Sequence, residues 1–572
     1  MGTPTVLGNT SLSSFDVLIM GSGAGGGPAA CILAQAGLKV LVVEAGVNYF
    51  DGLDDPTRMP TPRFSNCELK FGYRNNIQPD PVVDPRTWRS KVSDGDRTFV
   101  GAIQGLAKTV GGGAVHADLK MPRFEPQDFT LGTSIGSTWN PMGTNFADWP
   151  VDYDMLEPFY TYCEYALGVQ GLAGANPFEG PRSKPFPMPP GVPMYAALLL
   201  ADGLTQLGYH PFPFPCAVNS QPYDNRPACV ECGYCSGYGC PSNAKGSPAV
   251  TMLRKALLTG NCQLVTQTRA VKLLMNGAGN AVTGVSCLGP DGKPVTYTAD
   301  RYVLATSPIE DARLLFLSNP DGVGNSSGMV GCNLMFHLET TAVGIFPNRV
   351  HGHRGRTVSH GFADFRGVPN DPDHPLAGIV ELSGSELLLD EANYYRQIMA
   401  QTGGFQGSVL KALMRQSPGR DRLCAMAIKG EDAPQVSNRV DLDPDVKDLD
   451  GLPAPRITYL NHDFELSASA FYGPKLLDIM GAAGCKYAAP GPPALPASAH
   501  IMGTLRMGPD PTTSVCDPTG RFHDVGNLYA TDGALFPTSS GFNPTMTIVA
   551  LSTYVAGGMA YPGSPETAIS SS

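Results

Sequence analysis

Four cysteines crowd into twelve residues near the middle of the chain, where their thiolates could bind a metal. Cys229, Cys232, Cys235 and Cys240 read C-x2-C-x2-C-x4-C and are followed by Pro241. This spacing is close to the ferredoxin run C-x2-C-x2-C-x3-C-P, whose thiolates wrap an iron–sulfur cluster, whereas structural zinc usually draws on two separated C-x2-C pairs. The residues alone leave three alternatives open: an iron–sulfur cluster, zinc, or disulfides and free thiols.

A glycine-rich turn near the N-terminus has the residues needed to bind a dinucleotide. Gly21, Gly23 and Gly26 lie in GSGAGG, directly after the apolar run VLIM. Glu44 ends the next apolar run, eighteen residues beyond Gly26. Such glycines permit a tight turn, let backbone N–H groups reach a pyrophosphate and let a helix pack closely on a strand. The helix N-terminus favours the anion, and the Glu44 carboxylate would accept hydrogen bonds from a ribose.

The glycine-rich turn needs a parallel sheet around it, and the sequence predicts one. Residues 15–46 predict a β-α-β unit: an apolar run, the turn, an Ala-rich helical stretch and a second apolar run. Residues 263–304 alternate as a β-meander that returns to a core strand. Near the C-terminus, NLYATDG predicts a strand that enters an Asp-Gly turn. NPTMTIVALSTYVAGGMA predicts a closing helix with Pro544 suited to its first turn.

The region from about 340 to 495 predicts mixed α and β structure. AGIVEL and LCAMAIKG are short β-type runs, and residues 391–401 (EANYYRQIMAQ) and 466–484 (LSASAFYGPKLLDIMGAAG) predict helices. The Pro-rich sequence between about 145 and 240 does not predict regular sheet. These segments are candidates for the walls of a substrate site.

Composition excludes several classes of protein. Gly and Pro together make up about a fifth of the 572 residues, which excludes a long helical bundle or coiled coil. The formal charge of −11 argues against nucleic acid as a partner. No run of about 18 apolar residues predicts a membrane span. The N-terminus shows no secretory signal, so we expect a cytoplasmic protein by default, with periplasmic export alongside a partner as the alternative.

Five segments together resemble the glucose-methanol-choline (GMC) oxidoreductase family, which binds FAD. They are GSGAGG with EAG, TVGGGAVHADLKMPRF, IEDARLLFLSNPDGVGNSSGMVGCNLMFH, SAHIMGTLRMG and NLYATDGALFPTSSGFNPTMTIVAL. The pattern is most similar to the large subunits of gluconate, fructose and glucose dehydrogenases, and to pyranose-oxidase-like members. The resemblance runs nearly end to end and implies FAD, rather than NAD, as the dinucleotide.

The resemblance implies an α/β, Rossmann-like FAD-binding domain of GMC type and an α+β substrate-binding domain, both built from discontinuous segments. We expect the FAD-binding domain to comprise residues 1–125, 240–340 and 496–572. The substrate-binding domain and its connections would comprise residues 126–239 and 341–495, including the Cys-rich segment 229–240.

The resemblance also implies the residues that hold FAD. We expect contacts from Gly21, Ser22, Gly23, Gly26, Glu44, Val110, Gly111, Gly112, His116, Val271, Asp532, Gly533, Asn543, Pro544 and Thr545. His116 stands where pyranose-oxidase relatives attach FAD covalently, so a covalent bond is the alternative to the non-covalent binding that we expect. For Asp532 the alternative is an ordinary Asp-Gly turn, and for Val271 a plain core valine.

Two residues match the active-site pair of the family. His500 in SAHIMGT matches the active-site histidine, and Asn543 in GFNPT matches the second position, which holds Asn or His. Oxidation of an alcohol by a flavin needs removal of the hydroxyl proton as the carbinol hydride moves to flavin N5, so a group that titrates near neutrality should face the hydroxyl. We expect His500 to be this base and Asn543 to donate a hydrogen bond to the developing alkoxide.

The expected reaction is oxidation of a CH–OH group in a sugar, glycoside or other polyhydroxylated alcohol. The alternatives are an oxidase of bulky apolar alcohols (sterols or long-chain alcohols), and a hydroxynitrile-lyase-type flavoprotein that holds its flavin without reducing it.

The resemblance leaves the electron acceptor open between oxygen and an electron-transfer partner. In the dehydrogenase large subunits three cysteines at x5 and x3 spacing hold a cluster, and Cys229, Cys235 and Cys240 give x5 and x4. Cholesterol and long-chain alcohol oxidases of the family have related Cys-rich segments without a cluster.

Overall fold

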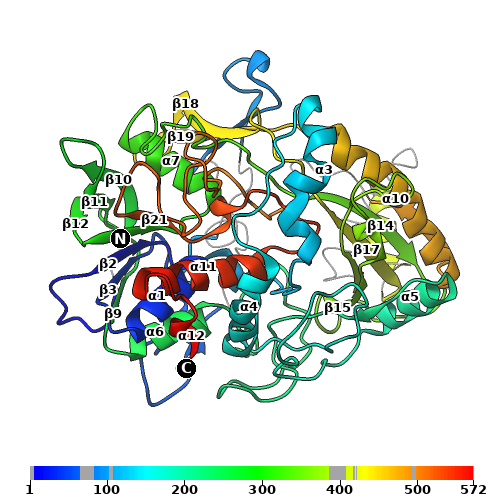
Figure 1. Cartoon of the computed structure of the whole chain (residues 1–572). Coiled ribbons are helices and arrows are strands. Elements are labelled where there is room, and N and C mark those ends of the chain that lie inside the picture. The colour runs from blue at the N-terminus through cyan, green and yellow to red at the C-terminus, as the bar shows by residue number, and fades with distance from the viewer. Residues whose placement is uncertain are drawn as a thin grey trace.

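A six-stranded sheet lies at the centre of one half of the molecule (Figure 1). The computed structural model describes residues 5–64, 83–101, 107–384, 407–416, 419, 421–491 and 498–570. The strand order is β1 (Val6–Gly8), β9 (Cys262–Val265), β3 (Val40–Val43), β2 (Val17–Met20), β13 (Arg301–Leu304) and β21 (Leu528–Ala530). All neighbouring pairs are parallel except β1 and β9. β2 and β3 are buried along their whole length, as expected of strands covered on both faces.

Helices from both ends of the chain cover this sheet. α1 (Gly26–Gln35) packs against α11 (Thr545–Ala560), and α11 packs against α4 (Tyr153–Leu167). The predicted β-α-β unit and the predicted closing helix are therefore confirmed. Pro544 immediately precedes the first residue of α11.

The predicted β-meander is also confirmed. β10 (Arg269–Met275), β11 (Val282–Leu288) and β12 (Pro294–Tyr297) form an antiparallel three-stranded sheet, and the chain then returns to the central sheet as β13. α7 (Pro308–Ser318) packs against β10.

The other half of the molecule is built on a second six-stranded sheet. Its order is β20 (Tyr487–Pro490), β14 (Leu338–Ile345), β17 (Leu423–Gly430), β16 (Val380–Gly384), β15 (Val358–Phe362) and β8 (Phe212–Pro213), with every pair antiparallel. α5 (Tyr195–Gln206) and α10 (Asp463–Ala482) pack on it (Figure 1). The α+β prediction is confirmed here, whereas the helix predicted at 391–401 lies outside the described residues.

A four-stranded sheet and shorter elements complete the described chain. The sheet order is β18 (Arg439–Lys447), β19 (Pro453–Thr458), β6 (Arg86–Arg89) and β7 (Phe99–Gly101). The shorter elements are β4 (Phe50–Asp51), β5 (Thr61–Pro62), α3 (Leu131–Trp139), α6 (Arg254–Leu258), α9 (Ser408–Gln416) and α12 (Thr567–Ser570). None of the helices in the described ranges has the length and apolar character of a membrane span. The division into two domains at the stated boundaries stays a prediction.

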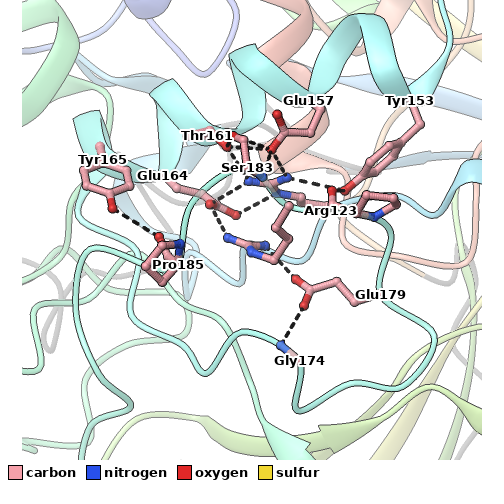
Figure 2. A network of polar contacts seen from close by, with 12 residues as sticks. Arg123, Tyr153, Glu157, Thr161, Glu164, Tyr165, Gly174, Glu179, Ser183 and Pro185 are labelled. Atoms are coloured by element: carbon pink, nitrogen blue, oxygen red, sulfur yellow. Dashed lines mark hydrogen bonds and ion pairs between the residues drawn. The ribbon is translucent and has the colours of Figure 1, made fainter.

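A buried network of charges holds the Pro-rich segment after α4 in place (Figure 2). The Arg123 guanidinium donates to both carboxylate oxygens of Glu164, each at 2.9 Å, and to Glu157 at 3.0 Å. Arg182, from the segment that follows the helix, also pairs with Glu164 and lies 2.6 Å from Glu179. Removing one member of a buried ion pair leaves an unpaired charge, so the network binds the segment firmly to α4.

Candidate active site

A cavity of about 800 Å³ is lined by residues from both six-stranded sheets. One end lies at the glycine-rich turn before α1, where Gly21, Gly23 and Glu44 line it. The other end is formed by β14, β16 and β17 together with His500 and Asn543. The cavity therefore connects the predicted nucleotide-binding turn with the predicted catalytic pair.

Gly21, Gly25 and Gly26 of the turn have no room for side chains. Gly21 has φ of +94°, and a Cβ on Gly26 would lie 2.0 Å from the Gly21 carbonyl oxygen. A Cβ on Gly25 would lie 2.6 Å from the Asp532 Cβ. The turn is thus pressed against its neighbours, and Gly23, Ala24 and Gly25, directly before α1, line the cavity, as a pyrophosphate site at a helix N-terminus requires.

Glu44 and Ser22 join the two glycine-rich segments. Glu44 Oε2 accepts hydrogen bonds from the Ser22 N–H at 2.9 Å and from the Ser22 hydroxyl at 2.6 Å, and Oε1 accepts from the Gly46 N–H at 2.7 Å. The Ser22 Oγ in turn accepts from the Gly111 N–H at 2.9 Å. Burial raises the pKa of Glu44, and these hydrogen bonds act in the opposite direction.

The predicted cofactor residues divide into two groups. Those that line the cavity are Gly21, Gly23, Glu44, Gly112, His116, Val271, Asp532, Gly533, Asn543, Pro544 and Thr545. Ser22, Gly26, Val110 and Gly111 are not among the lining residues. Ser22 and Gly26 are buried directly behind the turn, where they shape the wall rather than form its surface.

Val271 and Asp532 have specific backbone geometry. The register of β10 on β11 passes from Ala270 to Lys272, so Val271 lies in a bulge and its backbone groups are not part of the ladder. Asp532 accepts hydrogen bonds from the Ala534 N–H at 2.9 Å and the Ser307 N–H at 2.7 Å. The carboxylate therefore closes the Asp-Gly turn and also fixes Ser307, whose φ is +83°.

The structure does not support the metal alternatives for Cys229, Cys232, Cys235 and Cys240. In the described ranges, which include all four, no group of three or more His, Cys, Asp or Glu is arranged to hold a metal ion. The four thiols are free, so the structure shows no disulfide among them either. Burial raises the pKa of Cys229 to about 12 and also raises that of Cys235; burial acts in the same direction on Cys240, but Lys245 and local hydrogen bonds outweigh it and lower the pKa of Cys240.

The Cys-rich segment instead forms part of the cavity wall. The buried Lys245 ammonium donates to the carbonyl oxygens of Tyr238 at 2.7 Å, Ala117 at 2.8 Å and Cys235 at 2.9 Å. Ser236 and Gly237 line the cavity beside His116, whose carbonyl accepts a hydrogen bond from the Gly237 N–H.

His500 contacts a second histidine that sequence analysis did not single out. Its Nδ1 lies 2.9 Å from Nδ1 of His337, and His337 Nε2 lies 3.4 Å from the Ser539 carbonyl oxygen. A carbonyl only accepts, so His337 carries its hydrogen on Nε2 and its Nδ1 is an acceptor. His500 must then donate from its Nδ1 to the Nδ1 of His337, so the Nε2 of His500 carries no hydrogen and has a free lone pair.

Both histidines are neutral at neutral pH. Burial lowers the pKa of His337 to about 4. Burial, together with His337, Lys429 and Lys120, holds the pKa of His500 well below its ordinary value. The expectation of a group that titrates near neutrality therefore does not describe His500 in this structure, because desolvation disfavours the imidazolium.

Asn543 is held by a buried carboxylate that sequence analysis also missed. Its Nδ2 donates to Glu381 Oε1 at 3.0 Å. Glu381 Oε2 lies 2.8 Å from the Lys120 ammonium and 3.5 Å from that of Lys429. Although burial raises the pKa of Glu381, the two ammonium groups outweigh this effect and lower it to about 2. The anionic Glu381 carboxylate can only accept hydrogen bonds, so the Asn543 side chain is oriented with its Nδ2, rather than its Oδ1, toward Glu381.

Weak sequence signals existed for these missed residues. His337 ends the family segment that contains CNLMFH, while Glu381 and Lys429 lie in the predicted strands AGIVEL and LCAMAIKG. A charged residue in an otherwise apolar strand indicates a buried ion pair or a polar cavity. The sequence alone could not show that these strands are neighbours.

Comparison with known proteins agrees with this geometry. Two family profiles described as GMC oxidoreductase match residues 215–339 and 434–552. Paromamine 6'-oxidase of Streptomyces fradiae is 31% identical over 94% of this chain and 89% of its own length. The fructose dehydrogenase large subunit of Gluconobacter japonicus is 28% identical over 96% of this chain and 97% of its own.

The fold has relatives among solved structures. Pyridoxine 4-oxidase from Mesorbium loti superposes with a TM-score of 0.61 at 16% identity, covering 95% of this chain and 98% of its own. This similarity shows the fold, and the sequence matches confirm the family that the motifs indicated. The chain belongs to the GMC oxidoreductase family and is an FAD-dependent oxidoreductase.

Proposed function

We propose that this protein oxidises a CH–OH group of a sugar, glycoside or other polyhydroxylated alcohol, with His500 as the base. The observation that carries the proposal is that His500 and Asn543 line the same cavity as the glycine-rich turn. FAD bound along this cavity supplies the hydride acceptor. The relatives include a paromamine oxidase, a fructose dehydrogenase and a 2-methyl-1,2-propanediol dehydrogenase. The substrates in these names are polar alcohols, which supports a polar alcohol as the substrate of this protein.

The protein's own residues divide the work at the hydroxyl group. His500 Nε2 accepts the hydroxyl proton, because the contact with His337 leaves this nitrogen as a lone pair. One N–H of Asn543 is used by Glu381, and the other can donate to the substrate oxygen as it gains negative charge. The low pKa of His500 keeps the base unprotonated and ready to accept.

The catalytic end of the cavity is a poor site for a bulky apolar alcohol. Lys120, Glu339, Glu381 and Lys429 all line its catalytic end. An apolar chain placed against them would desolvate these charges without offering hydrogen bonds in return. This favours polyhydroxylated substrates over sterols or long-chain alcohols.

We expect FAD to be held without a covalent bond and the reduced cofactor to be reoxidised by oxygen or by an electron-transfer partner. Acid precipitation releases non-covalent FAD into the supernatant, whereas a flavin attached to His116 would stay in the pellet. Oxygen consumption during turnover, compared with reduction of an artificial acceptor, separates an oxidase from a dehydrogenase.

The test of the base is anaerobic flavin reduction by a panel of polyols and fatty alcohols in wild type and His500→Ala. The variant should retain its flavin and reduce it roughly 10²–10⁴-fold more slowly. Near wild-type reduction in the variant would show that another group removes the proton. Failure of every alcohol to bleach the flavin would leave the lyase alternative standing.

A further inference from the structure

The wall of the cavity opposite the glycine-rich turn is one face of the second sheet. Most of the strand residues that line the cavity alternate along their strand: Glu339, Thr341 and Val343 from β14, Glu381 and Ser383 from β16, and Ala425, Ala427 and Lys429 from β17, where Met426 lines the cavity as well. Glu339 lies directly opposite Lys429 in the register of β14 on β17. Small side chains in the middle strand leave room for a ligand, and charged ones lie at the end near Asn543.

The charges at this end do not balance. Lys120 pairs with Asp118 at 2.9 Å and with Glu381 at 2.8 Å, and Lys429 pairs with Glu339 and Glu381. These five described side chains carry three carboxylates and two ammonium groups. His500 and His337 add no positive charge, because both are neutral. The linked group therefore has one negative charge in excess.

The excess charge is exposed to the cavity through a carboxylate rather than an ammonium. The Glu339 side chain is 26% exposed, against 7% for Lys429 and 13% for Lys120. Both lysines are already used by the buried carboxylates around them. A ligand in the cavity would therefore meet the Glu339 carboxylate before it met either ammonium.

A second polar atom at this end, Asn543 Oδ1, lacks a hydrogen-bond donor among the described residues. Asn543 Oδ1 is buried and has no hydrogen-bond partner among the described residues, since its Nδ2 is turned toward Glu381. Asn543 is joined to Glu339 by a short path of contacts through Glu381 and Lys429. The Glu339 carboxylate, which lines the cavity, matches a ligand with N–H or O–H donors.

We propose that the substrate is an amino alcohol, such as an amino sugar, whose ammonium group pairs with Glu339 while its hydroxyl faces His500. This inference rests on the proposed function and narrows its substrate class. An ammonium group brings the missing positive charge and three hydrogen-bond donors to the Glu339 carboxylate, and charge-assisted hydrogen bonds of this kind are among the strong ones. A carboxylate-bearing sugar acid would instead add to the negative excess.

The test compares matched alcohols that differ only in charge. Wild-type holoenzyme is mixed anaerobically at pH 7 with 2-amino-1,3-propanediol or glycerol, and with glucosamine, N-acetylglucosamine, glucose or glucuronate. We expect kcat/KM for flavin reduction to be at least about tenfold higher for each amine than for its neutral counterpart, and lowest for glucuronate.

Two variants identify the residue responsible. Glu339→Gln should bring the kcat/KM of the amines to within about threefold of that of the neutral alcohols, and Glu339→Asp should retain the preference. Asp445→Asn is the matched control, because it removes the same charge from a side chain that is 67% exposed on β18. The Asp variant keeps the test valid if the Gln variant fails to fold.

Several results would overturn the inference. Equal rates for amines and neutral alcohols in wild type would refute it while the proposed function stood, as would a preference for glucuronate. An amine preference that survived in Glu339→Gln would show that another group binds the ammonium. Absence of flavin reduction by any alcohol would instead refute the proposed function, and the inference with it.

Discussion

Loss of the hydrogen-bond acceptor that His337 offers to His500 should slow proton removal without changing how the cofactor is bound. In the structure His337 Nδ1 accepts a hydrogen bond of 2.9 Å from His500 Nδ1. The asparagine side-chain oxygen can occupy the place of histidine Nδ1, whereas the glutamine oxygen reaches the place of Nε2. His337→Asn therefore keeps the acceptor for His500, and His337→Gln removes it.

The size of the effect follows from the buried hydrogen bond. A buried N–H that loses its acceptor costs about 1–3 kcal/mol. Here the cost falls on the His500 tautomer with its hydrogen on Nδ1, which is the form that the reaction needs. Because about 1.4 kcal/mol changes a rate tenfold, flavin reduction should slow by roughly 5–150-fold in His337→Gln and stay close to wild type in His337→Asn.

The assay is anaerobic stopped-flow at saturating substrate, with flavin content measured from the visible spectrum as the control. Equal rates in wild type and both variants would refute the view that His337 sets the tautomer of His500. Equal slowing in both variants would show that His337 acts through packing, since only one of them removes the acceptor.

Three further predictions concern the pH dependence of stability, the pH dependence of flavin reduction and the substitution of two glycines. Burial lowers the pKa of His337 to about 4, so between pH 4 and 6.5 the unfolded chain binds a proton that the folded protein does not. The contribution of His337 to the loss of stability as pH drops is at most about 3 kcal/mol over this range, and thermal unfolding at pH 7 and 4.5 should show a smaller loss in His337→Asn. Because the pKa of His500 lies well below its ordinary value, kcat/KM for flavin reduction should stay level from pH 8 to about 6; a limb centred near 6.5 would contradict this. Gly26→Ala places a Cβ 2.0 Å from the Gly21 carbonyl oxygen and should yield protein without flavin, whereas Gly481→Ala, with nothing within 4 Å, should retain it. Full flavin content in both variants would argue against the role given to the turn.

Local patterns predicted the nucleotide-binding half well. The run from Val17 to Val43 contains an apolar strand, glycines and a helix in adjacent positions, so spacing along the chain was enough to predict β2, α1 and β3. The motif around His500 likewise lies within a few residues. Such features depend on residues that are close together in sequence, so they can be identified from one amino-acid sequence.

The polar surroundings of the catalytic pair could not be predicted in the same way. His337, Glu381 and Lys429 come from three separate strands or strand ends, and their partners are decided by register and sheet order. The low pKa of His500 depends on burial that only the assembled cavity creates. The arrangement of the four cysteines could not be predicted for a related reason. Lys245, which lies outside the cysteine motif, orders that segment by donating hydrogen bonds to the carbonyl oxygens of Cys235 and Tyr238.

The strand order of the central sheet also has consequences for biosynthesis. β21 pairs with β13, and α11 covers α1, so α1, which also packs against the earlier helix α6, receives this last partner only after about 500 further residues have been made. At ribosomal rates of about 5–20 residues per second, the interval is roughly half a minute to two minutes. During that time the face of α1 that α11 covers is exposed to other nascent chains, and the edge of β13 that β21 covers is exposed from the moment β13 has been made. Efficient production should therefore depend on chaperones that bind the unfinished chain, and slower synthesis should increase aggregation.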